Sequence, residues 1–206
     1  MSRLLTAAFA SITALAALPA AAIESHCDMT LPRFTSDQAT DETSNPLMTR
    51  IPRNIVVEHA GFATPDAAAK CFGARYHDTR AAKHITYIVP VDGGWGYLTP
   101  AKGPRDAGRA YVEALYRAAQ STGHELHALA HTQPSGGFNF TSTDVVKMLG
   151  SSATLYITDK RNGTYRADGP TIRAYMQEHG LGHTTIATAR FLEHTKVRGF
   201  AGTLVK

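Results

Sequence analysis

Apolar residues follow two kinds of pattern along the chain, one typical of strands and one typical of helices. Short apolar runs bounded by turn residues predict strands, and they lie at 55–57, 85–89, 95–98, 125–133, 155–158 and 164–166. Longer windows with apolar residues at helical spacing predict helices at 65–75, 106–121, 144–149 and 171–179. This order of elements predicts an α/β (α+β) fold, a mixed sheet flanked by helices.

Turn and cap residues support several of these elements. Thr64, Pro65 and Asp66 suit a helix start: Thr can cap it, Pro fits its first position, and Asp favours the positive end of its dipole. Asp92-Gly93-Gly94 predicts a hairpin turn after the strand at 85–89. Asn162-Gly163 predicts a second hairpin, with a two-residue type I′ turn.

The N-terminus has the pattern of a bacterial secretory signal peptide. Arg3 supplies a positive charge, residues 4–18 form an apolar run, and Ala20-Ala21-Ala22 supplies small residues for cleavage. The run is shorter than the roughly 20 apolar residues that a membrane span needs, and no other stretch is long enough. We therefore expect residues 1–22 to be removed and the mature chain to be exported, periplasmic or secreted, with no membrane span.

The remaining chain divides by composition into a polar N-terminal arm at 23–54, a domain at 55–168 and an extension at 169–206. Cys27 and Cys71 are the two cysteines of the chain, one in the arm and one in the domain. In an exported protein an even pair predicts a disulfide, which would tether the arm to the domain. A catalytic thiol is the alternative interpretation.

The charge of the chain is only weak evidence for a polyanionic partner. The formal net charge is +4, and Arg3 of the expected signal peptide accounts for one unit of it. Basic residues are scattered, with no run longer than Lys160-Arg161, and no nucleic-acid-binding motif is present. We expect no nucleic-acid partner.

One motif carries candidate chemistry. His131-x-Gln133 is followed after seven residues by Thr141-x-x-Asp144. Side chains two apart on a strand point to the same face, so His131 and Gln133 should face one point. Thr141 and Asp144, three apart at the start of a helix, should lie on the same side of its first turn. The same two residues also match a helix capping box, which needs no metal.

This layout resembles the JAB/MPN (JAMM) metallohydrolase superfamily, and more closely the JAB-like domain of unknown function in bacterial polymorphic and RHS-repeat toxins. The resemblance covers roughly residues 57–168. It rests on five stretches: His131-Thr132-Gln133-Pro134, Phe140-Thr141-Ser142-Thr143-Asp144-Val145, Leu155-Tyr156-Ile157-Thr158, Thr64-Pro65-Asp66-Ala67-Ala68-Ala69 and Asp92-Gly93-Gly94-Trp95-Gly96-Tyr97-Leu98-Thr99-Pro100. The resemblance implies a JAB/MPN-like (cytidine-deaminase-like) core. It also implies a zinc ion held by two histidines and an aspartate, with a hydroxyl steadying an oxyanion and a glutamate base.

The chain departs from this pattern at two positions. Gln133 stands where the second histidine ligand belongs, and Lys83-His84 stands where the glutamate base belongs. An amide oxygen is a weaker zinc ligand than an imidazole, so we expect a degenerate zinc site and no active zinc hydrolase. The favoured function is that of a non-catalytic binding or toxin-system-associated protein, with a peptide or protein partner.

Two alternatives stay open. In the first, the protein is a zinc-dependent hydrolase of amide or isopeptide bonds with an altered ligand set. His131 and Asp144 would then bind zinc, His84 or His127 would complete the ligand set, and Thr141 would stabilise the oxyanion. In the second, the protein is an unrelated exported α+β domain.

Overall fold

The structure is a computed structural model of the whole chain. It describes residues 27–30, 51–52, 54–77, 83–103, 109–133, 153–159, 163–178, 180 and 203–206, with the side chains of 109–111 excepted. The predicted helix at 144–149 and the site residues Thr141 and Asp144 lie outside the described residues.

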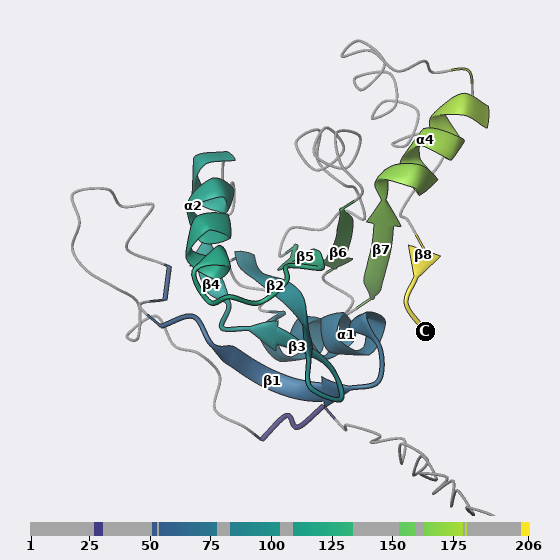
Figure 1. Cartoon of the computed structure of the whole chain (residues 1–206). Coiled ribbons are helices and arrows are strands. Elements are labelled where there is room, and N and C mark those ends of the chain that lie inside the picture. Colours follow the sequence, from purple (N-terminus) through teal and green to yellow (C-terminus); the bar gives the residue numbers. More distant parts are fainter. Residues whose placement is uncertain are drawn as a thin grey trace, which may run out of the picture.

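The described strands form one eight-stranded mixed sheet, and three helices accompany it (Figure 1). The strands are β1 (Val57–Phe62), β2 (Lys83–Val91), β3 (Gly94–Leu98), β4 (Ala101–Gly103), β5 (Ala128–Thr132), β6 (Thr154–Thr158), β7 (Thr164–Asp168) and β8 (Thr203–Leu204). The helices are α1 (Pro65–Tyr76), α2 (Arg109–Gln120) and α4 (Gly169–Glu178). The predicted α+β class, a mixed sheet with flanking helices, is confirmed.

Strands in the sheet follow the order β1-β3-β2-β5-β6-β7-β8, with β4 paired to β2. All described pairings are antiparallel except β5–β6, which is parallel. The carboxyl ends of β5 and β6 therefore meet at one edge of the sheet, beside the start of the antiparallel strand β2. That edge contains His131 and Gln133 of the candidate motif.

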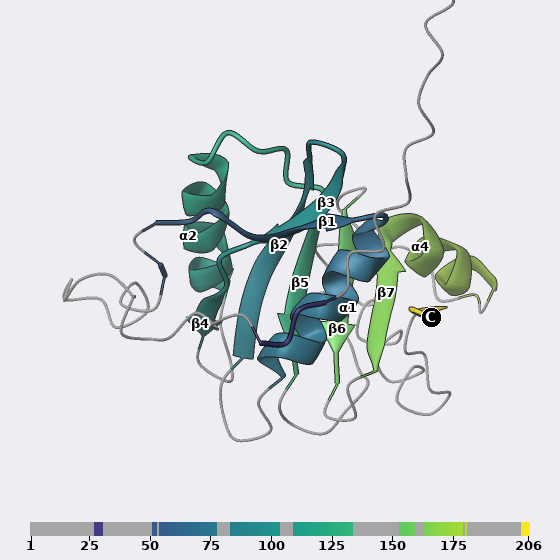
Figure 2. The ribbon, with the colours of Figure 1, turned by 90° about the horizontal axis from the view of Figure 1, so that it is seen from below.

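Helices α1 and α2 cover opposite faces of the sheet (Figures 1 and 2). Successive side chains of β2 alternate between the two faces, as expected for a strand. Ile88 joins the α1-side core with Phe72, whereas Ile85 joins the α2-side core with Leu115 and Ala119. These two clusters are the hydrophobic core of the described protein.

The local sequence explains how α1 is fixed. Thr64 caps its first turn by accepting a hydrogen bond from the Ala67 N–H at 3.1 Å, as predicted. Asp66 accepts hydrogen bonds from the Tyr156 hydroxyl at 2.5 Å and from Arg166 at 3.1 Å, so the helix start is attached to β6 and β7. Further along, Gly73 lies so close to β6 that a Cβ atom there would come within 2.1 Å of the Thr158 hydroxyl.

Strand β1 is an edge strand, as the apolar run at 55–57 suggested, although it begins later and extends to Phe62. Its pairing with β3 is interrupted by two register shifts, between Val57 and His59 and between Ala60 and Phe62. Close approach of the strands requires glycine in β3, because a Cβ at Gly96 would lie 2.6 Å from the His59 carbonyl oxygen.

Two hairpins were predicted, and both are present. Asp92 and Gly93 join β2 to β3, and Gly93 has the positive φ of 81° that the turn requires. The second hairpin joins β6 to β7, but the two-residue turn at Asn162-Gly163 is wrong. Asp159 and Gly163 are themselves hydrogen-bonded across the hairpin, so residues 160–162 separate the last paired positions.

The structure differs from the sequence-based prediction in three other segments. The strand expected at 125–133 is shorter, because β5 begins at Ala128 and ends at Thr132. The arm at 23–54 was expected to be loosely structured apart from its tether, yet Ile51 is buried in the α2-side core. In the extension at 169–206, the predicted helix is α4, and β8 pairs with β7 in the same sheet. Within the described part of the chain, no helix is long and apolar enough to cross a membrane.

Candidate functional site

The carboxyl end of β5 brings His131 and Gln133 to one face of the sheet. His131 pairs with Ile85 on β2 and with Ile157 on β6. The Gln133 N–H donates to the Thr158 carbonyl oxygen at 2.8 Å, so the β5–β6 ladder continues one residue beyond the assigned strand. The two side chains, two apart on extended backbone, therefore point to the same face, as predicted.

Strand β2 adds a cation to this face. Ile85 is the partner of His131 and shares its face, so Lys83, two residues earlier, shares it as well. Both polar side chains are buried, with exposed fractions of 8% for Lys83 and 2% for His131. The side chain of Lys83, one of the two residues that stand where the family resemblance implies a glutamate, thus lies on the sheet face of His131.

His84 points to the other face. The centroid of its ring lies 5.2 Å from that of Tyr76 in α1. The backbone N–H of His84 donates a hydrogen bond to the Thr132 hydroxyl at 3.0 Å. The sheet therefore lies between the side chains of His84 and His131. His84 does not complete a ligand set with His131 in this structure.

His127 is also separated from the motif. It precedes the opposite end of β5, where its N–H donates to the Ile88 carbonyl oxygen. Its ring lies 4.6 Å from that of Trp95. Thus neither His84 nor His127, the two histidines considered as replacement zinc ligands, lies beside His131.

Asp159 is an additional carboxylate at the same edge, which the sequence analysis overlooked. It follows β6 directly and, two residues after Ile157, it shares the face of His131. Its side chain is only 3% exposed and accepts a hydrogen bond from the Gly163 N–H at 2.9 Å. The available signal was an acidic residue immediately after the buried run of β6. Its observed contact fixes the β6–β7 hairpin.

The described residues supply few metal donors at this edge. No three His, Cys, Asp or Glu side chains of the described ranges come together as a metal site. Thr141 and Asp144 lie outside those ranges. The expected zinc ligands for which a position is described are thus His131 and, at the degenerate position, Gln133.

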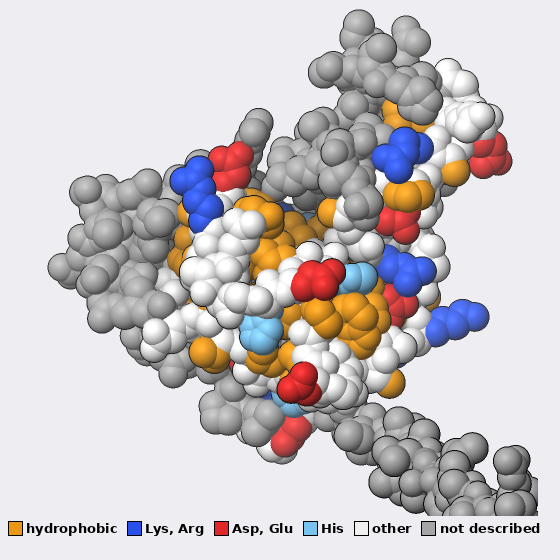
Figure 3. All heavy atoms as spheres, viewed as in Figure 1, with side chains coloured by type: hydrophobic (Ala, Val, Ile, Leu, Met, Phe, Trp, Pro, Cys, Tyr) orange, Lys and Arg blue, Asp and Glu red, His pale blue; other side chains and the backbone are white. Residues whose placement is uncertain are grey.

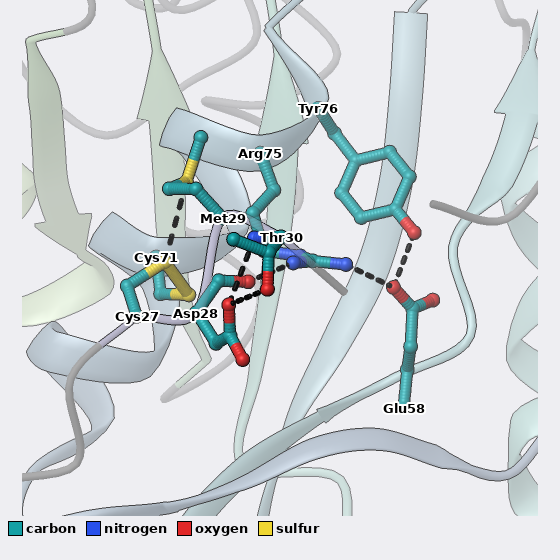
Figure 4. Close-up of a disulfide and its surroundings, with 8 residues drawn as sticks. All are labelled: Cys27, Asp28, Met29, Thr30, Glu58, Cys71, Arg75 and Tyr76. Carbon is teal, nitrogen blue, oxygen red and sulfur yellow. Dashed lines mark hydrogen bonds and ion pairs between the residues drawn. A yellow bond between two sulfur atoms is a disulfide. The ribbon is translucent and has the colours of Figure 1, made fainter. Parts of the chain in front are cut away.

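A second polar cluster lies on the α1 side of the sheet (Figure 4). Arg75, although only 1% exposed, lies 3.7 Å from the Glu58 carboxylate and donates a hydrogen bond to the Asp28 carbonyl oxygen. The Tyr76 hydroxyl also donates to Glu58. Burial raises the pKa of the Glu58 carboxyl above its ordinary value, while the hydrogen bond from Tyr76 and the charge of Arg75 oppose that rise.

The predicted disulfide between Cys27 and Cys71 is confirmed and borders this cluster (Figure 4). Cys71 lies in α1 and is buried, whereas Cys27 is partly exposed. The bond holds residues 27–30 against α1, where Asp28 meets Arg75. The cysteine count predicted the bond, but nothing in the sequence indicated the buried arginine beside it.

Charged side chains are distributed singly over one face of the described protein. Figure 3 shows Lys and Arg side chains lying apart and interspersed with Asp and Glu on the face viewed there.

Comparisons of the chain with protein-family models, with curated proteins and with solved structures found no match. The site must therefore be interpreted from its own residues and geometry.

Proposed function

We propose that the protein is an exported, JAB-like binding domain in which a lysine side chain has replaced metal chemistry. The observation that carries this proposal is the position of Lys83 on the same sheet face as His131 and Gln133. A buried ammonium repels a divalent cation at short range, so this face is poorly suited to zinc. Gln133, which is partly exposed at the same end of the sheet, can donate and accept hydrogen bonds through its amide, which suits recognition of a polar group on a peptide or protein partner.

The location of the residues supports a binding role. They lie at the carboxyl ends of the parallel strands β5 and β6, and ligands of open α/β sheets commonly bind at such an edge. The alternative of an active zinc hydrolase loses support because His84 and His127 lie away from His131. That alternative also lacks a second imidazole ligand, because Gln133 stands in its place, and a glutamate base, because Lys83 stands at that end of β2.

Zinc titration of the mature protein and its variants tests the proposal. Wild type should bind zinc weakly. Gln133→His restores the missing imidazole and should raise zinc affinity by several kcal/mol, on the scale of one ligand. Lys83→Glu in the Gln133→His background should raise it further, because a carboxylate replaces the repelling cation. Gln133→Asn is the matched control and should leave the affinity unchanged.

The outcomes separate the two parts of the proposal. Near-stoichiometric zinc in the wild type, lost in both His131→Ala and Asp144→Ala, would overturn the non-catalytic role. An unchanged affinity in Gln133→His would overturn the JAB-like layout, because residues 131, 133 and 144 would then not converge.

Export is a separate part of the proposal. It is supported by the sequence of residues 1–22, and the disulfide is compatible with an oxidising compartment. Intact-mass measurement of protein recovered from the periplasm or medium of an expressing bacterium should give a chain that begins at Ile23. A mass that retains residues 1–22 would contradict it.

A further inference from the structure

The end of the sheet opposite His131 carries the single tryptophan of the chain. Trp95 lies in β3, where it pairs with Phe62 of β1 and with Pro90 of β2. Its side chain packs against the α1-side core, yet the residue stays partly exposed. The ring of His127, which is also partly exposed, lies beside it with the ring centroids 4.6 Å apart. An indole that is both packed and exposed is well suited to bind a partner.

The backbone on both sides of Trp95 is held closely against β1. A Cβ atom at Gly94 would lie 2.5 Å from the Phe62 carbonyl oxygen, and one at Gly96 would lie 2.6 Å from the His59 carbonyl oxygen. Only glycine permits this approach, so Trp95 is fixed between two paired strands. A side chain that is fixed before binding loses little conformational entropy when a ligand contacts it.

The segments that build this end of the sheet contain acidic residues but no lysine or arginine. They are residues 59–65 after the start of β1, residues 88–97 around the β2–β3 hairpin, and residues 118–128 between α2 and β5. Asp92 in the hairpin turn and Glu125 before β5 are both exposed. Figure 3 shows hydrophobic side chains near the middle of the viewed face, with His and acidic side chains beside them.

A cation complements both the indole and the carboxylates. The face of an indole attracts a cation electrostatically, and arginine is the residue most often found there. Its guanidinium is planar and weakly hydrated, so it can lie against a ring, whereas the compact ammonium of lysine is strongly hydrated. The carboxylates of Asp92 and Glu125 add a favourable field for a positive group that approaches this end.

We propose that Trp95, His127, Asp92 and Glu125 form a docking surface for an arginine side chain of a partner peptide. The arginine stacks on the Trp95 ring, and the two exposed carboxylates favour its approach. His127 and His131 lie at opposite ends of β5, so this surface is separate from the edge to which the proposed function is assigned. The inference therefore does not depend on that function.

The fluorescence of Trp95 tests the choice of ligand, because the chain contains no other tryptophan. The mature protein is titrated at low salt with an acetylated and amidated pentapeptide in which glycine and arginine alternate. Matched peptides carry lysine or glutamine in place of arginine. The arginine peptide should change the fluorescence saturably, and the glutamine peptide should bind about tenfold more weakly, with lysine between them. Equal binding of the arginine and glutamine peptides would overturn the proposal.

Charge variants test the location of the site. Glu125→Gln and Asp92→Asn change exposed side chains, so each should keep the fold and weaken binding of the arginine peptide about threefold. Glu178→Gln makes the same change of charge at an exposed position on α4 and should leave the affinity unchanged. An equal loss in Glu178→Gln would show that the net charge alone attracts the peptide, and it would overturn the site.

Ring variants test the role of the indole. Trp95→Leu keeps an apolar side chain but removes the ring, and Trp95→Phe keeps a smaller ring that preserves more of the packing. Binding is then followed by the amide resonances of residues 121–128. Trp95→Leu should weaken binding of the arginine peptide about tenfold and Trp95→Phe by less, because tryptophan binds cations best. Gln133→Asn, at the other end of β5, should bind as wild type does whether or not the proposed function holds. Unchanged affinity in both Trp95 variants would overturn the proposal.

Discussion

At the scale of single residues, Glu58 and Arg75 form the most unusual pair of the described chain. Charged side chains are almost never fully buried unless they are paired, and Arg75 is nearly inaccessible to solvent. Two of its partners come from separate places in the sequence: Glu58 in β1 and Asp28 in residues 27–30. Burial also favours the protonated form of Glu58, so this pair should respond to pH.

We predict that Glu58→Gln gains stability relative to wild type as pH rises. The raised pKa of Glu58 means that the folded chain holds a proton that the unfolded chain releases near pH 4.5. The contribution of Glu58 to the free energy of unfolding therefore falls as pH rises from that value through the pKa of the folded state. A glutamine at this position contributes equally at every pH. Urea unfolding between about pH 4 and pH 7 measures the difference. Glu125→Gln at an exposed position is the control, and parallel curves for Glu58→Gln and wild type would contradict the prediction.

The candidate site shows which residue-scale features a sequence can predict. The two-residue spacing of His131 and Gln133 was sufficient to place them on one face, because that period is a property of every strand. It could not decide whether Lys83 or His84 faces them. That choice depends on the pairing of Ile85 with His131, which joins segments 46 residues apart and follows from the packing of the whole sheet.

At the scale of elements, α1 is attached at its start, its middle and its end. Thr64 caps the first turn, Cys71 joins the middle of the helix to Cys27, and Gly73 and Arg75 near its end contact β6 and Asp28. The sequence predicted the start of the helix because caps are local. It did not reveal the role of Gly73, because a glycine within a helix has no local purpose and only its neighbour in space explains it.

We predict that Gly73→Ala destabilises the protein by up to about 2 kcal/mol. A new methyl group would overlap the Thr158 side chain, and overpacking costs about 1–3 kcal/mol. The better helix propensity of alanine offsets about 1 kcal/mol of this. Chemical denaturation measures the change. Thr158→Ala should remove the overlap and partly restore the stability of Gly73→Ala. The double variant should therefore lose less free energy of unfolding than the two single variants lose together. A stabilised Gly73→Ala would show that the helix and β6 are farther apart.

We predict that Thr64→Ala destabilises the protein by about 0.5–2 kcal/mol, the usual cost of losing a helix cap. The physical reason is that the Ala67 N–H loses its acceptor at the start of α1. Thr64→Ser keeps a hydroxyl oxygen at the same place and should lose far less stability. Thermal unfolding of the three proteins compares them, and equal losses in both variants would show that the hydroxyl is not the stabilising group.

At the scale of the whole molecule, one sheet separates two cores. The apolar run at 85–89 predicted the strand β2, and apolar residues on both of its faces are typical of a strand that is covered on both sides. The sequence could not show which helix covers which face, since that depends on how the chain crosses the sheet. Nor did local turn signals predict the longer β6–β7 connection, because strand register overrides turn preference.

We predict that conservative core changes on opposite faces add independently. Ile85→Val and Ile88→Val are three positions apart on β2, yet they lie in different clusters. Each should cost about 0.5–1.5 kcal/mol, and the double variant should equal their sum within about 0.5 kcal/mol. Phe72→Leu with Tyr97→Leu is the contrasting pair. The centroids of these two rings lie 5.7 Å apart, so the free-energy changes of the two substitutions should be coupled. Urea unfolding gives all the values, and a strong coupling between Ile85 and Ile88 would contradict the division into two cores.

The interrupted pairing of β1 has a consequence for behaviour at high protein concentration. An edge strand with regular unpaired N–H and C=O groups is a template on which another molecule can add a strand, and this is how many aggregates begin. The two register shifts in β1 break that regularity within a strand of six residues. The same irregularity that shortens the ladder with β3 thus protects the protein from self-association into fibrils. Sequence changes that straighten β1 should lower colloidal stability even where they raise the stability of the fold.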